Sequence, residues 1–94
     1  MNEEPPRIEF TQRFDKQLKK APPEIKEAFI EALELFLENP MHPNLQNHAL
    51  GKKLTGYRSI DVTGDWRAVF KEKQTNEQKV IVFDLFGTHK DLYG

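Results

Sequence analysis

The sequence predicts an α+β fold in which one strand and two helices precede three antiparallel strands. Apolar residues recur at helical spacing only before residue 39. Between residues 56 and 83 they instead form short alternating or continuous runs, which is the pattern of strands. Helices gathered early and strands gathered late are typical of the α+β class.

Residues 7–10 predict the first strand, because polar and apolar residues alternate from Arg7 to Phe10. Thr11 is a suitable N-cap for a helix that starts directly after it. In that helix Phe14 and Leu18 stand four residues apart and therefore share one face.

The prolines at positions 22 and 23 separate the first helix from a second, stronger one. Proline disfavours helix in the residues before it but suits the first turn of a new helix. The second helix has an apolar stripe at helical spacing, made of Ile25, Phe29, Ala32, Leu33 and Phe36. The break between the helices is short, so we expect them to pair as a hairpin on one face of the sheet.

Residues 39–54 show no periodicity and predict a loop rich in proline, asparagine and glycine. Three strands follow, at Gly56–Val62, Trp66–Glu72 and Val80–Phe83, with turns at residues 63–65 and 75–77. The last strand is continuously apolar, which indicates a central strand buried on both faces. We expect the second face of the sheet to be open, with Arg67 on it or at its rim.

Length and composition limit what the chain can be. With 94 residues we expect one domain over residues 1–94, in which residues 1–6 are flexible. The chain has no cysteine, which excludes disulfides and thiolate chemistry. Its start is acidic and contains prolines, unlike a signal peptide, and no apolar run approaches the roughly 20 residues of a membrane span. We therefore expect a cytoplasmic protein without a membrane partner.

The charge is unevenly distributed along the chain. The formal net charge is −1, whereas a general nucleic-acid binder is clearly basic. Residues 1–38 carry nine acidic and six basic residues, while residues 39–94 carry eight basic and six acidic residues and all three histidines. If the protein binds RNA, it must do so through a local patch in its second half.

The second half resembles the RelE/YafQ toxin superfamily in four ordered motifs. These motifs are Asn47–Gly51, Gly56–Val62, Asp65–Phe70 and Gly87–Tyr93. The closest similarity is to the YafQ branch, and it extends from about Phe10 to the end of the chain. Each motif alone is weakly specific, but their order makes the set informative.

The resemblance implies a RelE-like fold of order β-α-α-β-β-β, with an N-terminal strand and a two-helix hairpin packed on an antiparallel sheet. It also implies a cytosolic toxin of a type II toxin–antitoxin pair that cleaves mRNA, often in the ribosomal A site. The active-site positions of the YafQ branch fall on His48, Asp65, His89 and Tyr93.

Two positions depart from the pattern of that branch. A basic residue is common two positions before the Gly-Thr-His motif, where this chain has Leu85. Another active-site histidine of the branch falls on Asp61. Both changes reduce the positive charge near a bound phosphate.

The residue types fit RNA cleavage by attack of the 2′-hydroxyl, which needs a proton acceptor, a proton donor and cations for the phosphate. Histidine performs either proton transfer near neutral pH, and arginine matches phosphate oxygens. No cofactor is needed for this reaction. The candidate proton-transfer and orienting groups are His48, His89, Asp61 and Asp65, with Tyr93 as an aromatic platform; the candidate phosphate-binding groups are Lys52, Lys53, Arg58 and Arg67.

Structural roles compete with several of these interpretations. His48 in its loop is also explained as an exposed polar residue, and Asp65 as a turn former. Tyr93 is equally explained as a cover over the core, and the two arginines as partners in surface salt bridges. A metal site built from the histidines and aspartates is a further reading, but no recognised ligand spacing supports it.

Two other functions share the same fold. A ParE-like toxin would bind and inhibit DNA gyrase without cleaving RNA, and an inactive member of the superfamily would do neither. The pair of histidines favours the nuclease, because a gyrase inhibitor has no evident need for proton-transfer groups.

The expected partners are a cognate antitoxin protein and mRNA on the ribosome. The solvent side of the second helix is acidic, through Glu24, Glu27, Glu31 and Glu34. We therefore expect an antitoxin to bring basic residues to the helices, or to lay a helix or strand near the loop of residues 39–54.

Overall fold

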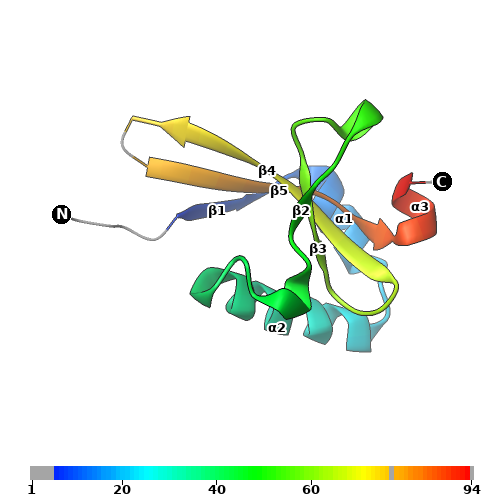
Figure 1. Ribbon diagram of the computed structural model, residues 1–94. Helices are drawn as coiled ribbons and strands as arrows, with labels where there is room; N and C mark the ends of the chain where they lie inside the picture. Colours follow the sequence, from blue (N-terminus) through cyan, green and yellow to red (C-terminus); the bar gives the residue numbers. More distant parts are fainter. Residues whose placement is uncertain (1–5, 77, 94) are drawn as a thin grey trace.

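The computed structural model describes residues 6–76 and 78–93, and a five-stranded sheet of order β1-β5-β4-β3-β2 forms its centre (Figure 1). The elements are β1 (Arg7–Phe10), α1 (Gln12–Lys19), α2 (Pro23–Glu38), the 3₁₀ turn η1 (Pro43–Leu45), β2 (His48–Ala49), the 3₁₀ turn η2 (Lys52–Leu54), β3 (Arg58–Asp61), β4 (Trp66–Thr75), β5 (Gln78–Thr88) and α3 (His89–Tyr93). The predicted α+β class and the predicted order of the main elements are confirmed.

The strand β5 is an interior strand of the sheet, between β1 and β4, as its continuous apolar run predicts. It pairs in parallel with β1 and antiparallel with β4. Val80, Ile81, Val82 and Phe83 are all at most 7% exposed. Residues 1–5, which we expected to be flexible together with Pro6, and Glu77 of the predicted turn lie outside the described residues.

The two long helices begin where the sequence predicts. The backbone N–H of Phe14 donates to the Thr11 side chain at 3.2 Å, which makes Thr11 the N-cap of α1. Pro23 occupies the first turn of α2. None of the helices in the described part of the chain has the length and apolar content of a membrane span.

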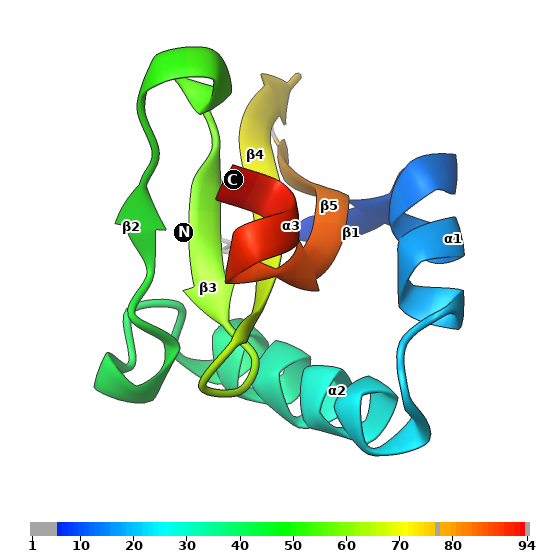
Figure 2. The same cartoon turned by 90° about the vertical axis from the view of Figure 1, so that its right-hand side faces the viewer.

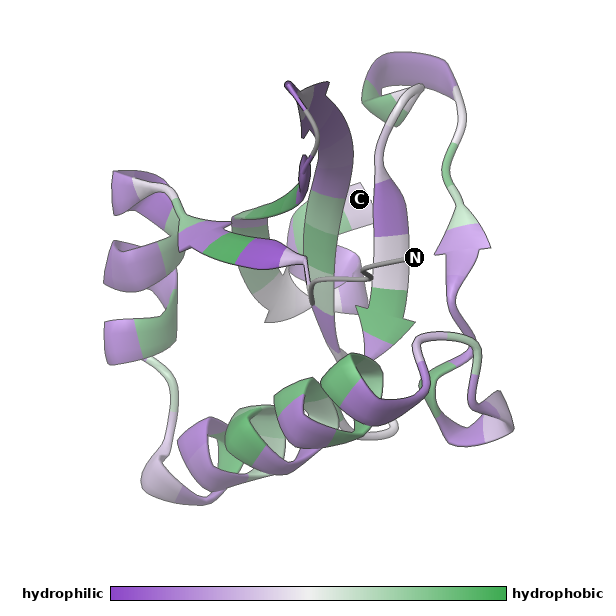
Figure 3. Ribbon diagram, turned by 90° about the vertical axis from the view of Figure 1, so that its left-hand side faces the viewer, coloured by the Kyte–Doolittle hydropathy of each residue, from purple (hydrophilic) through white to green (hydrophobic). Residues whose placement is uncertain are grey.

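The helices spread apart instead of lying side by side, as Figures 2 and 3 show from opposite directions. The helix α1 runs along β5 beyond the end of β1. There the backbone N–H of Thr11 donates to Phe83 O, and the backbone N–H of Phe86 donates to Gln17 Oε1. The segment around α1 therefore supplies hydrogen-bond partners to the backbone of β5 beyond the end of β1. The broad apolar side of α2 covers the sheet.

A cluster of aromatic rings fills the space between the helices and the sheet. Ring centroids lie 5.6 Å apart for Phe14 and Phe83 and 5.1 Å apart for Phe36 and Phe70. Such contacts add about 0.5–1.5 kcal/mol each beyond the burial of apolar area. The aromatic members of this core are Phe14, Phe29, Phe36, Phe70, Phe83 and Phe86.

A β-bulge interrupts the alternation of β5. Val69 of β4 pairs with Leu85 but its neighbour Phe70 pairs with Phe83, so Asp84 is the extra residue. The bulge lets Phe83 and Phe86 both face the helices, whereas a regular strand would turn one of them away.

The second face of the sheet, which we call the open face, is less exposed than the sequence suggests. The short helix α3, which the sequence does not predict, folds back over its centre (Figure 2). Two side chains on this face, Ser59 and Val69, have no exposed surface at all. The loop of residues 39–54 also contains a short strand, β2, that extends this face at its edge.

Candidate active site

The strand register aligns the candidate residues in two rows on the open face. In the first row His48 of β2 lies opposite Ser59 of β3, which in turn lies opposite Val69 of β4. In the second row Asp61 lies opposite Arg67. Residues directly opposite each other project to the same face, so His48, Asp61 and Arg67 share the open face.

The helix α3 carries Tyr93 onto the first row. The Tyr93 hydroxyl donates a hydrogen bond of 2.8 Å to Ser59 Oγ. The ring of His89 meets the ring of Tyr93 edge-on, with centroids 4.7 Å apart. His89, Tyr93, Ser59 and His48 therefore form a continuous series across the face.

The start of α3 is held close to the β3–β4 turn, and this brings His89 to Asp65. The backbone N–H of His89 donates to the carbonyl of Asp65 at 2.9 Å. Gly87 lies directly against α3, since a Cβ at this position would be in van der Waals contact with Leu92 Cδ2 at 3.4 Å. The Asp65 side chain is exposed, as is that of His89.

The ring of His48 is oriented by its own loop. Its Nδ1 lies 2.7 Å from the carbonyl oxygen of Gln46, a residue with a left-handed backbone (φ 48°). A carbonyl only accepts, so this contact requires the proton on Nδ1 in the neutral ring. The Nε2 lone pair is then available to accept a proton.

Arg67 and Asp61 form an ion pair, with 3.0 Å between Nε and Oδ1 and with both side chains at least four-fifths buried. The Nη1 atom of Arg67 also donates to the carbonyls of Thr63, Gly64 and Trp66. Both side chains are therefore engaged in holding the β3–β4 turn.

Arg58 does not join the other candidates. It lies opposite Phe70, and so projects to the face that carries the helices. Its Nε donates to Asn47 Oδ1 at 2.8 Å, which ties β3 to the loop before β2. The two arginines that the sequence offered as candidate phosphate-binding residues, Arg58 and Arg67, thus lie on opposite faces.

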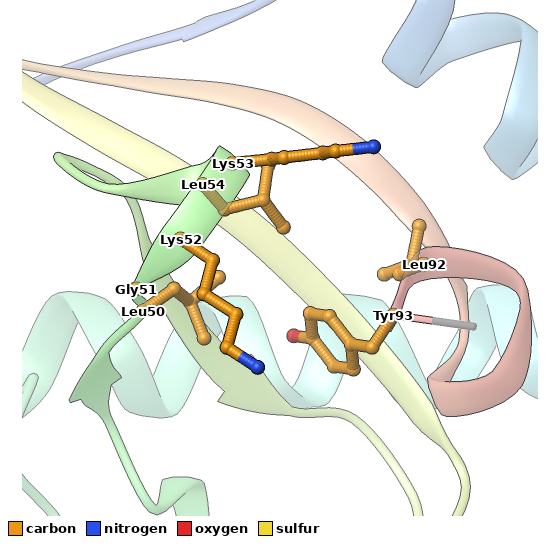
Figure 4. Close-up of a pocket in the computed structure, with 7 residues that line it drawn as sticks. All are labelled: Leu50, Gly51, Lys52, Lys53, Leu54, Leu92 and Tyr93. Carbon is orange, nitrogen blue, oxygen red and sulfur yellow. The ribbon is translucent and has the colours of Figure 1, made fainter.

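Lys52 and Lys53 line a cavity of about 500 Å³ between η2 and α3. Figure 4 shows both lysine side chains on one side of the cavity and Leu92 and Tyr93 on the other. Leu50 and Leu54 complete an apolar wall. The cavity therefore combines an aromatic ring, aliphatic side chains and two cations, which suits a nucleotide.

A second polar network, which the sequence did not reveal, joins α1, β3 and β5. Arg13 donates to both carboxylate oxygens of Asp84, at 3.0 Å from Nε and 2.8 Å from Nη2. The Tyr57 hydroxyl donates to Asp84 Oδ2 at 2.9 Å. The signal in the sequence was a charged residue inside an otherwise apolar strand.

This network shifts the pKa values of its members. The hydrogen bonds from Arg13, followed by that from Tyr57, lower the pKa of Asp84 to about 2 against the opposing effect of burial. The hydrogen bond to the ionised Asp84 raises the pKa of Tyr57 and that of Arg13. Asp84 is therefore a carboxylate at neutral pH.

The alternative metal site would need a cluster of metal-ligating side chains. Across residues 6–76 and 78–93, no three His, Asp or Glu side chains gather closely enough to hold a metal ion. The aspartate of the second row, Asp61, is instead paired with Arg67.

Comparison with known protein families gives one match that covers nearly the whole chain. The model of the family described as the bacterial toxin of type II toxin–antitoxin systems, YafQ, matches residues 6–94. No protein with a curated description matches the chain.

Solved structures with similar folds include several toxins. The crystal structure of YafQ from E. coli has 26% sequence identity and a TM-score of 0.76, covering 95% of this chain and 99% of that one. The E. coli DinJ–YafQ toxin–antitoxin complex matches at 24% identity and a TM-score of 0.73, covering 96% and 99%. The RelBE2 toxin–antitoxin complex of Mycobacterium tuberculosis matches at 23% identity and a TM-score of 0.68, covering 90% and 99%.

Proposed function

Because the chain belongs to the YafQ family of bacterial type II toxins, we propose that it is an endoribonuclease that cleaves mRNA by attack of the 2′-hydroxyl on the adjacent phosphate. The observation that carries this proposal is the series His89, Tyr93, Ser59 and His48 across the open face. Two histidines flanking an aromatic ring provide a proton acceptor and a proton donor on either side of a bound nucleotide.

We assign the two proton transfers to different histidines. His48 accepts the 2′-hydroxyl proton through Nε2, because the carbonyl of Gln46 engages Nδ1. His89 then donates a proton to the 5′-oxygen that leaves. The exposed Asp65 is adjacent to His89 through the backbone hydrogen bond between the two residues.

The growing charge on the phosphate is stabilised by Lys52 and Lys53, which line the cavity beside Tyr93. Arg67 contributes by holding the β3–β4 turn, since its donors already bind Asp61 and three carbonyls. Arg58 contributes by positioning the β2 loop through Asn47. With two lysines in the cavity and a net charge of −1, we propose that the ribosome supplies much of the substrate positioning.

A cognate antitoxin is the proposed protein partner, as DinJ is for E. coli YafQ in its complex. Two apolar residues of α2 that lie outside the predicted stripe, Ile30 and Leu37, are 56% and 47% exposed. They stand seven residues apart and share one side of α2 with exposed glutamates at positions 27 and 34. We propose that an amphipathic basic helix of the antitoxin packs on this side.

Expression in a bacterial host tests the function. Induction of the wild-type chain should arrest growth and produce cleaved mRNA, and co-expression of the short gene adjacent to it should relieve the arrest. The double variant H48A/H89A should accumulate without arresting growth. Arrest with intact mRNA and inhibited DNA supercoiling would instead support the gyrase alternative, and harmless expression of soluble wild type would contradict the toxin function.

Cleavage assays with the purified wild-type protein test whether the activity depends on ribosomes. Purified protein should cleave mRNA on programmed ribosomes much faster than the same mRNA alone, because too few cations are present to hold free RNA. Equal rates with and without ribosomes would contradict this part of the proposal.

A further inference from the structure

A fixed aromatic side chain flanked by cations lies on the open face, beyond the candidate active site. Tyr57 precedes β3, and its hydroxyl reaches Asp84 on β5, so its ring crosses over the intervening β4. The Nζ of Lys71 on β4 lies 5.7 Å from the centre of that ring. Arg13 approaches from α1 and binds the same carboxylate. We call Arg13, Tyr57 and Lys71 the Tyr57 patch.

The ring of Tyr57 is held rigidly but remains partly exposed. Asp84 is 7% exposed, and the bidentate contact with Arg13 fixes its carboxylate. The hydroxyl of Tyr57 is thereby anchored at 2.9 Å. A ring that is already immobile loses little conformational entropy when a planar ligand stacks on it.

The charge around the ring is positive toward solvent. The negative group, Asp84, is buried beneath the patch, while the Arg13 side chain is 58% exposed. Lys71 is exposed and forms no ion pair with any residue that the structure describes, and the same holds for Lys73, two residues further on the same side of β4. An aromatic platform bordered by cations is the combination that binds single-stranded nucleic acids.

The patch is also continuous with the candidate active site. Tyr57 stands two residues before Ser59 on the same strand edge, and Lys71 stands two residues after Val69. Two residues advance about 7 Å along a strand, so the patch forms the next row of the same face. A strand of RNA whose scissile phosphate lies at the first row would pass over it.

We propose that the Tyr57 patch is a second nucleotide-binding subsite, in which a base next to the cleaved position stacks on Tyr57 while Lys71 and Arg13 contact its phosphates. This inference rests on the proposed nuclease function. Arg13 of α1 and Lys71 of β4 lie outside the four motifs that carry the family resemblance, whereas Tyr57 lies within Gly56–Val62. The residues of the patch take no part in the proton transfers.

Binding of a non-cleavable RNA tests the subsite directly. A short 2′-O-methyl oligonucleotide should shift the ring NMR signals of Tyr57, even if its affinity is only millimolar. Y57F retains the ring and should bind within about twofold of wild type, whereas Y57L should bind roughly 5- to 100-fold more weakly, the effect of losing one stacked base. K71Q should weaken binding and reduce its salt dependence by about one charge, while K19Q, an exposed lysine of α1, should do neither.

Each outcome separates the subsite from the nuclease function. If Y57L and K71Q bind the oligonucleotide as wild type does, or if its shifts are confined to His48, His89 and Tyr93, the subsite is refuted while the nuclease function stands. If these variants lose only their affinity for the antitoxin, the patch binds protein and the proposal is overturned. Equal thermal stability of Y57F and Y57L would show that the comparison does not reflect misfolding.

Discussion

The residues of the first row differ in how far the sequence alone reveals them. His48 and His89 stand out because they occur in ordered motifs and because histidine has few roles that demand it in a loop or tail. Ser59 does not stand out, since its contact with Tyr93 depends on the fold-back of α3. Arg67 and Asp61 were visible as charges, but their mutual pairing depends on the register of β3 and β4.

Replacing His89 tests its assignment as a proton donor. H89A should lower the rate of mRNA cleavage by roughly 10²–10⁴-fold, the contribution of a true acid or base. The matched control is K90A, which changes the next exposed residue of α3 and should cleave at close to the wild-type rate. Single-turnover cleavage on programmed ribosomes measures both, and an unchanged rate for H89A would remove His89 from the mechanism.

The pKa of Asp84 predicts how stability depends on acid. Its pKa in the folded protein is about 2, below the ordinary 3.8, so ionisation of this group stabilises the fold above about pH 4. As the pH falls from about 4 to about 2 this contribution is lost, and it amounts to roughly 1–2 kcal/mol. Urea unfolding at a series of pH values should therefore show a smaller loss across this range for D84N than for wild type. Parallel curves for the two proteins would contradict the pKa.

At the scale of elements, those with a strong repeating pattern were the predictable ones. The alternation of polar and apolar residues in β4 and the apolar stripe in α2 each extend over several residues. The structure has a strand and a helix at these two places. By contrast β2 has two residues and α3 has five, which is too short for any periodicity to appear. The strand β5 extends to Thr88, well past its predicted end, because the bulge at Asp84 breaks the alternation that would have revealed it.

A part-buried hydrogen bond between the side chains of Tyr93 and Ser59 contributes to the attachment of α3 to the sheet. Y93F should lower the free energy of unfolding by about 1 kcal/mol or more, because it leaves the hydroxyl of the fully buried Ser59 without its partner. S59A/Y93F should cost clearly less than the sum of the two single variants. Urea denaturation of the four proteins of this cycle measures the coupling, and strictly additive costs would show that the bond does not anchor α3.

At the scale of the whole molecule, charge and shape distinguish two sides of the surface. The open face carries His48 and His89, the cavity lysines and the Tyr57 patch, whereas α2 presents glutamates with Ile30 and Leu37 between them. An antitoxin that bound only α2 would leave the open face accessible. We therefore expect it to extend a further segment over the cavity between η2 and α3 in order to block RNA.

The chemistry of the cleaved RNA end tests most directly whether the 2′-hydroxyl attacks the phosphate with histidines as proton-transfer groups. The upstream fragment released on programmed ribosomes should end in a 2′,3′-cyclic phosphate, as determined by mass spectrometry. A single 2′-deoxy substitution at the cleaved nucleotide should prevent the reaction, because the attacking group is then absent. A fragment with a free 3′-hydroxyl, or efficient cleavage of the 2′-deoxy substrate, would contradict this mechanism.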